Sequence, residues 1–241
     1  LGLLKMDFLG LRTLTVIQNA VLLARRKQPE LNINQIDYND QKVLDYIGTG
    51  KTDGVFQLES AGMKGFMKEL KPHNLEDVIA GISLYRPGPM DFIPQYIRGK
   101  NDSSSITYDC PQLEPILAPT YGCIVYQEQV MQIVRDLAGY SLGRSDLLRR
   151  AMSKKKAAVM EKERKIFIYG DEETGVPGCI KNGIDEQTAN KIYDEMIDFA
   201  KYAFNKSHAA AYAVVSYQRR AWVVPEPGRF YYASFSKKCI E

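Results

Sequence analysis

The sequence predicts a mainly α-helical chain with a few short strands. Apolar residues recur three or four positions apart from Leu11, from Met63 and from Val130, which is the spacing that lines one face of a helix. Pro72 follows the second of these runs, and proline ends helices. With 241 residues and 45% apolar content, the chain can bury a core as one large or two small domains.

Composition and charge exclude several classes of protein. The net charge is only +3, so a nucleic-acid partner would have to bind a local basic patch. There is no run of about 18 apolar residues and no signal-peptide pattern, which predicts no membrane partner and no export. The cysteines lie too far apart to indicate zinc or a disulfide framework, and a reducing cytoplasm fits them best; they are Cys110, Cys123, Cys179 and Cys239. Because the chain opens on Leu1 without a methionine, we expect it to be part of a longer protein.

The first two predicted elements are a strand and a helix. In residues 3–9 apolar side chains alternate with Lys5 and Asp7, which would project from one face of a strand roughly 7 Å apart. The helix that begins near Leu11 ends in the basic run 25–27, where cations favour the negative end of the helix dipole.

Residues 48–52, Gly-Thr-Gly-Lys-Thr, look like the end of a phosphate-binding P-loop. That motif needs a glycine where Asp45 stands, a strand before it and a helix after it. The preceding residues have helical spacing, and Asp53-Gly54 predicts a turn before a short strand at residues 55–58. We therefore reject a P-loop and the nucleotide hydrolase that it would indicate.

The middle of the chain predicts two capped helices and a rigid turn. Ser60 begins one helix, and Asn74 can cap the next. Residues 86–89, Arg-Pro-Gly-Pro, break the second helix and present Tyr85 and Arg86 at a fixed angle. These two side chains are either a contact point or part of a plain turn.

The stretch Asp146 to Lys156 predicts a helix that gathers five cations with almost no compensating acid; they are Arg149, Arg150, Lys154, Lys155 and Lys156. Its expected buried residues are Leu147, Leu148, Ala151 and Met152. Residues 139–143 indicate the turn before this helix, so Asp146 would lie near its start. Such a surface favours phosphate, and the simpler alternative is a solvated charged face. A loop at 170–183 and a helix at 185–203 follow. The residues of this helix that we expect to face inward are Ala189, Ile192, Met196 and Phe199.

A final, alanine-rich helix can be capped by Ser207. Backbone N–H groups at a helix start bind anions, and Lys206 and His208 lie there. Tyr202 and Phe204 offer aromatic faces beside them. The segment is either a ready anion site or an ordinary capped turn between two helices.

Six stretches between Leu1 and Gln218 carry a specific combination of motifs; they read LGLLKMDFLGLRTLTVI, GVFQLESAGM, YRPGPM, PTYGCIVYQEQVMQI, GYSLGRSDLLRRAMSKKK and FNKSHAAAYAVVSYQ. In this order they resemble the alpha subunit of bacterial DNA polymerase III, a C-family replicative polymerase, and the DnaE type more than the PolC type. The resemblance implies residues 1–9 as the last palm strand, 10–218 as the fingers domain and 219–241 as an uncertain continuation.

The resemblance also implies the activity and partners of the whole protein. It would be a DNA-directed DNA polymerase, a nucleotidyltransferase that acts on primer-template DNA and deoxynucleoside triphosphates. Other holoenzyme subunits would bind through regions outside this chain. Asp7 matches the third of three catalytic aspartates that bind two Mg²⁺ ions, and the other two form an Asp-x-Asp pair that this sequence lacks. One aspartate cannot hold both ions, so we expect the fragment alone to be inactive.

Residues that the resemblance places around the incoming nucleotide are Lys5, Arg149, Arg150, Tyr202, Phe204, Asn205, Lys206 and His208. Those that it places on the primer-template backbone are Lys154, Lys155 and Lys156. Ser153 and Ala203 stand where the family usually has glycine, and Arg144-Ser145 replaces two smaller residues, which could narrow the pocket. The alternative from another class is a noncatalytic helical nucleic-acid-binding module. The two hypotheses differ in whether triphosphate binding competes with duplex binding or is independent of it.

Overall fold

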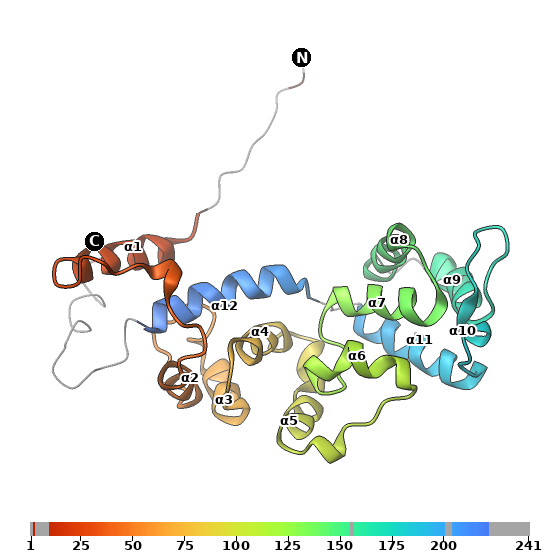
Figure 1. Cartoon of the computed structure of the whole chain (residues 1–241), viewed down its shortest axis with the longest axis horizontal. Coiled ribbons are helices and arrows are strands. Elements are labelled where there is room, and N and C mark those ends of the chain that lie inside the picture. The colour runs from red at the N-terminus through yellow and green to blue at the C-terminus, as the bar shows by residue number, and fades with distance from the viewer. Residues whose placement is uncertain (1, 3–9, 155–156, 201–203, 222–241) are drawn as a thin grey trace. The chain divides into compact units, whose positions relative to one another are not determined.

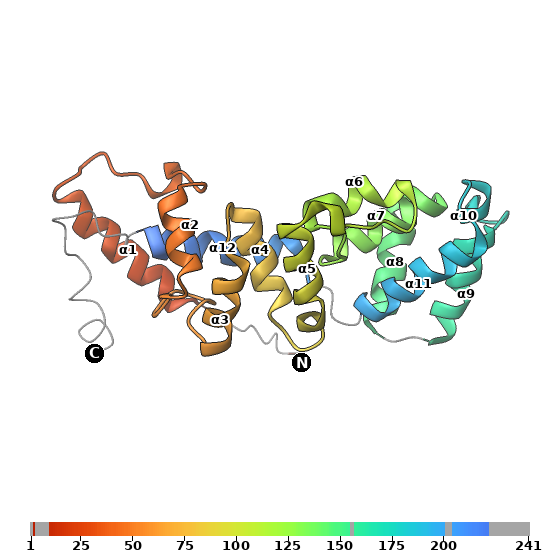
Figure 2. The same cartoon turned by 90° about the horizontal axis from the view of Figure 1, so that it is seen from below.

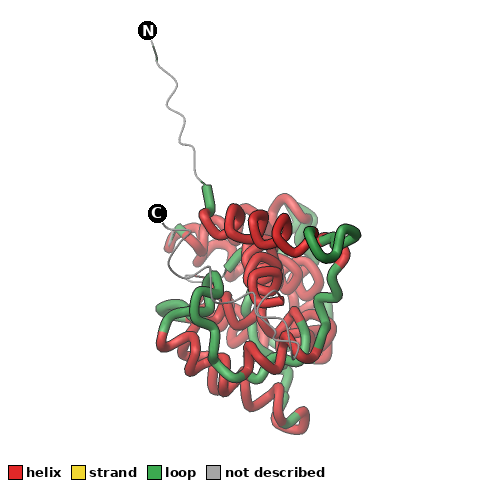
Figure 3. The backbone as a smooth tube through the Cα atoms, turned by 90° about the vertical axis from the view of Figure 1, so that its left-hand side faces the viewer, coloured by secondary structure: helices red, strands yellow, loops and turns green. Residues whose placement is uncertain are grey.

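The computed structural model describes residues 2, 10–154, 157–200 and 204–221. Within them lie twelve α-helices joined by loops and short 3₁₀ turns, which confirms the mainly α-helical prediction (Figure 3). Of β-structure, these residues contain only two isolated bridges, Tyr126 with Phe204 and Asp171 with Val176.

Of the two short strands predicted from the sequence, one lies in the described residues and is absent there. Residues 55–58 form turns, not a strand, because Gln57 adopts a left-handed backbone with φ of 63° that an extended strand does not allow. The strand predicted at 3–9, with Lys5 and Asp7, lies outside the described residues.

The chain divides into two compact units, each described by itself. The first holds the described residues up to Val78 together with those from Ala211 onwards, and the second holds residues 79–210. The helices of the first unit are α1 (Arg12–Arg25), α2 (Gln41–Gly48) and α3 (Ala61–Leu70), with the first turn of α4 (Leu75–Leu84) and the later part of α12 (Lys206–Ala221), as Figure 1 labels them.

Helix boundaries in the first unit follow the sequence signals. The Ser60 hydroxyl accepts a hydrogen bond from the backbone N–H of Met63 at 3.3 Å and so caps α3, as predicted. The side-chain oxygen of Asn74 accepts from the N–H of Asp77 at 2.9 Å, which confirms the second predicted cap. Thr49 is the C-cap of α2, so residues 48–52 end a helix, in agreement with the rejection of a P-loop.

The later part of α12 is fastened to early segments of the first unit. The hydroxyl of Tyr217, a fully buried side chain, donates to the carbonyl of Asp37 at 2.9 Å. The hydroxyl of Ser216 donates to the carbonyl of Phe56 at 2.6 Å, and the Phe56 ring meets Tyr212 edge-on at 5.0 Å. These contacts close the unit across more than half of the sequence.

The second unit contains the remaining helices: α5 (Ile93–Asn101), α6 (Glu114–Leu117), α7 (Gln127–Ala138), α8 (Leu142–Ser153), α9 (Ala157–Tyr169), α10 (Gly178–Lys181) and α11 (Glu186–Ala200). Helices α7 to α11 pack side by side in Figures 1 and 2, around one continuous apolar core. Fully buried members of this core include Ile133, Leu137, Phe167, Tyr193 and Met196. The apolar face predicted for the helix after Asp185 is thereby confirmed, and Asp185 caps it by accepting from the N–H of Thr188 at 2.9 Å.

Three predictions about the second unit were wrong in detail. Helix α8 begins at Leu142, four residues before Asp146, because the Ser141 hydroxyl caps it by accepting from the N–H of Arg144 at 3.3 Å. Leu147 is 67% exposed, since the buried stripe of this helix runs through its neighbour Leu148 and residues three and four positions further on. The loop predicted at 170–183 contains the short helix α10.

Candidate phosphate-binding site

Helix α8, which carries the predicted basic surface, is anchored in the core of the second unit. Leu148 and Met152 are buried in the core of the second unit, which fixes the rotation of the helix about its axis. Arg150 lies on the solvent side with 62% of its side chain exposed, whereas Arg149 is only 21% exposed. The two neighbouring arginines therefore occupy different environments.

Asp146 compensates both arginines, contrary to the expectation of a helix face with almost no acid. One of its carboxylate oxygens accepts from Nε and Nη2 of Arg149 at 3.0 and 2.7 Å. Nε of Arg150 lies 2.7 Å from the other oxygen. The hydrogen bonds from Arg149, with its charge and that of Arg150, hold the pKa of Asp146 below its usual value. The acid lies three and four residues before the arginines, so a single helix turn brings the three side chains together.

Arg149 also reaches out of its own helix. Its Nη1 donates to the side-chain oxygen of Gln127, in the first turn of α7, at 3.0 Å. The backbone N–H of Gln127 donates in turn to the carbonyl of Phe204 at 3.0 Å, next to the parallel bridge between Tyr126 and Phe204. The start of α7 thus connects the basic face of α8 to the segment that leads into α12.

The carboxylate of Glu128, from α7, lies at the N-terminal end of α12, where the sequence predicted an anion site. The backbone N–H of Lys206 donates to both oxygens of Glu128, at 3.2 and 3.1 Å, and the side-chain amide of Asn205 donates to one of them at 3.0 Å. This N–H is therefore not open, as the sequence had led us to expect. The cap is Asn205, not Ser207, because the helix starts two residues earlier than predicted and the Asn205 oxygen accepts from the N–H of His208 at 2.9 Å.

An aromatic and cationic stack lies over the same segment. The guanidinium carbon of Arg86 is 3.8 Å from the centroid of the Phe204 ring, and His208 meets that ring edge-on at 5.3 Å. The ammonium of Lys206 lies 5.2 Å from the Tyr126 ring. The Arg86 side chain of the predicted turn therefore packs on Phe204 within the second unit.

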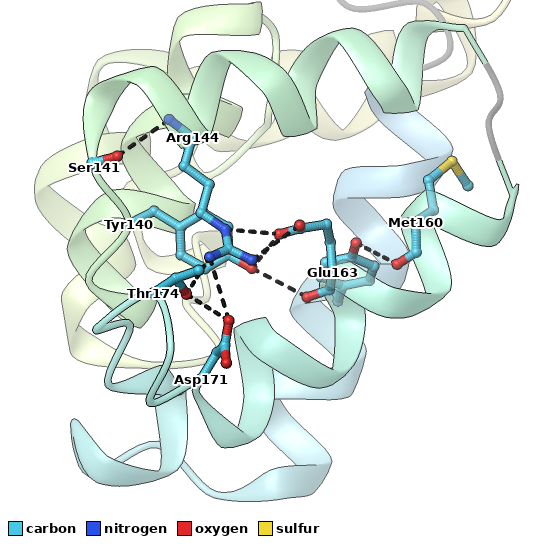
Figure 4. Close-up of polar contacts among 8 residues, drawn as sticks. Tyr140, Ser141, Arg144, Met160, Glu163, Asp171 and Thr174 are labelled. Atoms are coloured by element: carbon cyan, nitrogen blue, oxygen red, sulfur yellow. Dashed lines mark hydrogen bonds and ion pairs between the residues drawn. The ribbon is translucent and has the colours of Figure 1, made fainter.

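A second, deeper cluster holds the start of α8 against α9 (Figure 4). The guanidinium of Arg144 donates to Glu163 through Nε at 3.2 Å and through Nη2 at 3.1 Å, and also donates to Thr174, with Asp171 beside it at 3.8 Å. The hydroxyl of Tyr140 donates to Glu163 at 2.9 Å, and its burial, with the nearby Glu163 charge, raises the pKa of the tyrosine. Arg144 therefore contacts α9 and the loop after it.

The structure brings five of the sequence-predicted nucleotide residues into one connected group; they are Arg149, Phe204, Asn205, Lys206 and His208. Arg150 joins this group through Asp146, and Lys154 is exposed at the C-terminal end of α8. The other predicted site residues lie outside the described part of the chain; they are Lys5, Asp7, Lys155, Lys156 and Tyr202.

Sequence reasoning missed Gln127, Glu128 and the role of Asp146. Gln127 and Glu128 stand out in the sequence only as the polar start of an apolar helix. Their partners lie 22 and 78 residues further along the chain, which no local pattern encodes. Among the described residues no three His, Cys, Asp or Glu side chains lie together so that they could hold a metal ion.

Comparison with known proteins agrees with the resemblance carried by the motifs. Residues 13–175 match the family model described as the bacterial DNA polymerase III alpha subunit finger domain. The chain is 49% identical over 233 residues to a DNA polymerase III subunit alpha of Halalkalibacterium halodurans, covering 96% of this chain and 20% of that protein. The corresponding protein of Thermus aquaticus is 50% identical over 224 residues, covering 90% and 18%, and that of Bacillus subtilis is 47% identical over 219 residues, covering 90% and 19%.

This chain thus spans about a fifth of the length of the curated relatives that it matches. None of the described helices is long and apolar enough to cross a membrane. The matched region includes α1 to α9, and with them the arginines of α8 and the start of α7. The chain therefore belongs to the family of bacterial DNA polymerase III alpha subunit finger domains.

Proposed function

We propose that this chain supplies the surface on which a DNA-directed DNA polymerase of the bacterial cytoplasm holds the incoming deoxynucleoside triphosphate and the primer-template backbone. The observation that carries the proposal is the link through Gln127, which joins Arg149 on α8 to Phe204 before α12. Two cationic segments that are remote in sequence thereby form one site. Other holoenzyme subunits are expected to bind the whole protein outside this chain.

In the proposed function Arg149 and Arg150, with Lys5, contact the triphosphate. A guanidinium has five N–H donors in a planar fork, and Asp146 engages Nε of Arg150, which leaves the Nη pair for a phosphate. Charge grows on the phosphate oxygens in the transition state, and fixed cations lower the barrier by stabilising it.

The segment before α12 is proposed to contact the nucleoside. Arg86 lies over the Phe204 ring and His208 meets it edge-on, so the ring is fixed in place. Asn205 and Lys206 follow it in the chain, and Tyr202 is assigned to the same nucleoside contact. Lys154, Lys155 and Lys156 are assigned to the phosphates of the primer-template, where point charges suffice.

The two Mg²⁺ ions of the proposed reaction belong to the whole polymerase, with Asp7 as one ligand, and would supply the activation of the primer 3′-hydroxyl and the neutralisation of the leaving pyrophosphate. Residues of the described chain bind and orient the triphosphate and do not themselves break a bond. We accordingly expect no primer extension by this chain alone.

The proposal is tested by nucleotide binding to a full-length alpha subunit that contains this chain, with and without duplex DNA. We expect Lys206→Ala to weaken triphosphate binding and Arg98→Ala, at an exposed cation on α5, to leave it unchanged. Duplex binding without triphosphate binding at this surface would instead favour the noncatalytic nucleic-acid-binding module.

A further inference from the structure

The first turn of α7 contains three consecutive polar residues, Gln127, Glu128 and Gln129, whose side chains contact three different parts of the second unit. Gln127 contacts α8 and Glu128 contacts the start of α12. Gln129 is buried and donates a hydrogen bond to Thr120, which precedes α7. Buried or shared polar groups of this kind fix geometry, because each must keep its hydrogen bonds.

Gln129 makes the turn itself rigid. The residue is 5% exposed, and its amide oxygen accepts from the backbone N–H groups of Val125 and Tyr126 at 2.8 and 2.9 Å. Its amide nitrogen donates to the carbonyl of Ile116 at 3.2 Å and to the Thr120 hydroxyl at 2.7 Å. With both ends of the amide hydrogen-bonded, rotating or shifting the turn would leave buried polar groups unpaired, which is unfavourable.

Gln127 fixes this rigid turn to both segments of the proposed site. Its side-chain oxygen accepts from Nη1 of Arg149, and its backbone N–H donates to the carbonyl of Phe204, each at 3.0 Å. Arg149 is also held by Asp146, so its guanidinium is oriented from two sides. The position of the Arg149 guanidinium on α8 therefore depends on the position of Gln127 on α7.

Glu128 fixes the turn to α12. Both carboxylate oxygens accept from the N–H of Lys206, and one also accepts from the Asn205 amide. The carboxylate belongs to the first turn of α7 and lies at the N-terminal end of α12, where the dipoles of both helices favour a negative charge. The contact therefore orients the residues that follow Phe204.

We propose that Gln127 and Glu128 are positioning residues, which set the distance between the arginines of α8 and the segment Phe204 to Lys206. The inference rests on the proposed function and adds two residues to it that need not touch the nucleotide. Positioning matters because a displacement of about 1 Å in a catalytic arrangement can cost on the order of 100-fold in rate.

The test uses a full-length alpha subunit that contains this chain, with the substitutions Gln127→Ala, Glu128→Ala and Glu128→Gln. Gln132→Ala, at an exposed glutamine of the same helix, is the matched control. Measured are kcat, the KM for the triphosphate, the Kd for primer-template and the thermal unfolding midpoint. We expect both alanine variants to raise the KM and lower kcat, by on the order of 10-fold to 100-fold in kcat/KM, at unchanged primer-template Kd.

Glu128→Gln keeps one acceptor oxygen for Lys206, so it should recover most of the activity lost in Glu128→Ala, and Gln132→Ala should match the parent. Unchanged kinetics in both alanine variants, beside an impaired Arg150→Ala enzyme, would overturn the positioning role alone. Losses of activity that merely follow a lower unfolding midpoint and a weaker primer-template Kd would overturn it as well. Unchanged kinetics in Arg150→Ala would instead overturn the proposed function.

Discussion

Arg144 and Glu163 form a two-point ion pair between α8 and α9, with Nε to Oε2 at 3.2 Å and Nη2 to Oε1 at 3.1 Å. Their side chains are 16% and 15% exposed, so water screens the pair little. The pair lies one helix turn and a half before Arg149 and Arg150. The pair therefore holds the start of α8 against α9.

Breaking this pair should destabilise the protein. We expect Arg144→Ala to lower the free energy of unfolding by about 3 kcal/mol, the lower end of the range for removing one partner of a buried pair, because Glu163 keeps its bond from Tyr140. Urea titration followed by circular dichroism measures the change. The matched control is Arg135→Ala, which removes an exposed pair with Asp136 and should change the free energy of unfolding much less, because water and salt screen that pair. Equal effects of the two substitutions would show that the cluster at Arg144 is no anchor.

We expect the carboxyl of Asp146, which is paired with both Arg149 and Arg150, to have a lowered pKa. Because Arg149 donates to Asp146, the pKa of this carboxyl lies below the usual value of about 3.9. The folded-state pKa is depressed, so the stability from these contacts is present above about pH 3.9 and is lost as the pH falls through the folded-state pKa. A carboxyl-resolved NMR titration should show the pKa of Asp146 rising in Arg149→Ala, and rising less in Arg150→Ala. An unchanged pKa in both variants would contradict the pairing.

Binding of primer-template DNA to the lysines at the C-terminal end of α8 should depend steeply on salt concentration. Lysines that replace counterions on phosphates give an affinity that falls linearly with salt on a double-logarithmic plot. We expect Lys154→Ala to weaken binding at low salt and to reduce the slope by about 1, whereas Lys181→Ala, at an exposed position on α10, should change neither. Fluorescence anisotropy with a labelled primer-template provides the measurement. A slope that does not respond to Lys154 would remove the end of α8 from the DNA-binding surface.

The sequence predicted the features that arise within a few residues. The caps at Ser60 and Asn74 and the buried face of α11 follow from local hydrogen bonding and from helical periodicity, and the structure has them as predicted. The start of α8 was misplaced because both Ser141 and Asp146 are suitable helix-start residues, and a single sequence does not rank them.

The partners of the site residues could not be predicted in the same way. That Glu128 accepts from Lys206, and Gln127 from Arg149, depends on how α7, α8 and α12 pack, which is a property of the whole second unit. Asp146 is a different case, since its spacing of three and four residues from the arginines does indicate a helix-face pair.

The arginines of α8 are proposed to act on the triphosphate, and the substitution Arg150→Ala in a full-length alpha subunit probes this role. Loss of one such contact to developing charge typically costs roughly 2.7–4 kcal/mol, or about 10²–10³ in rate, and Arg150→Lys should not restore it because an ammonium lacks the planar fork. Single-turnover incorporation and primer-template affinity are measured side by side, with Arg98→Ala as control. We predict a strongly reduced incorporation rate at nearly unchanged DNA affinity. An incorporation rate equal to that of the parent would show that the basic face of α8 is only a solvated surface.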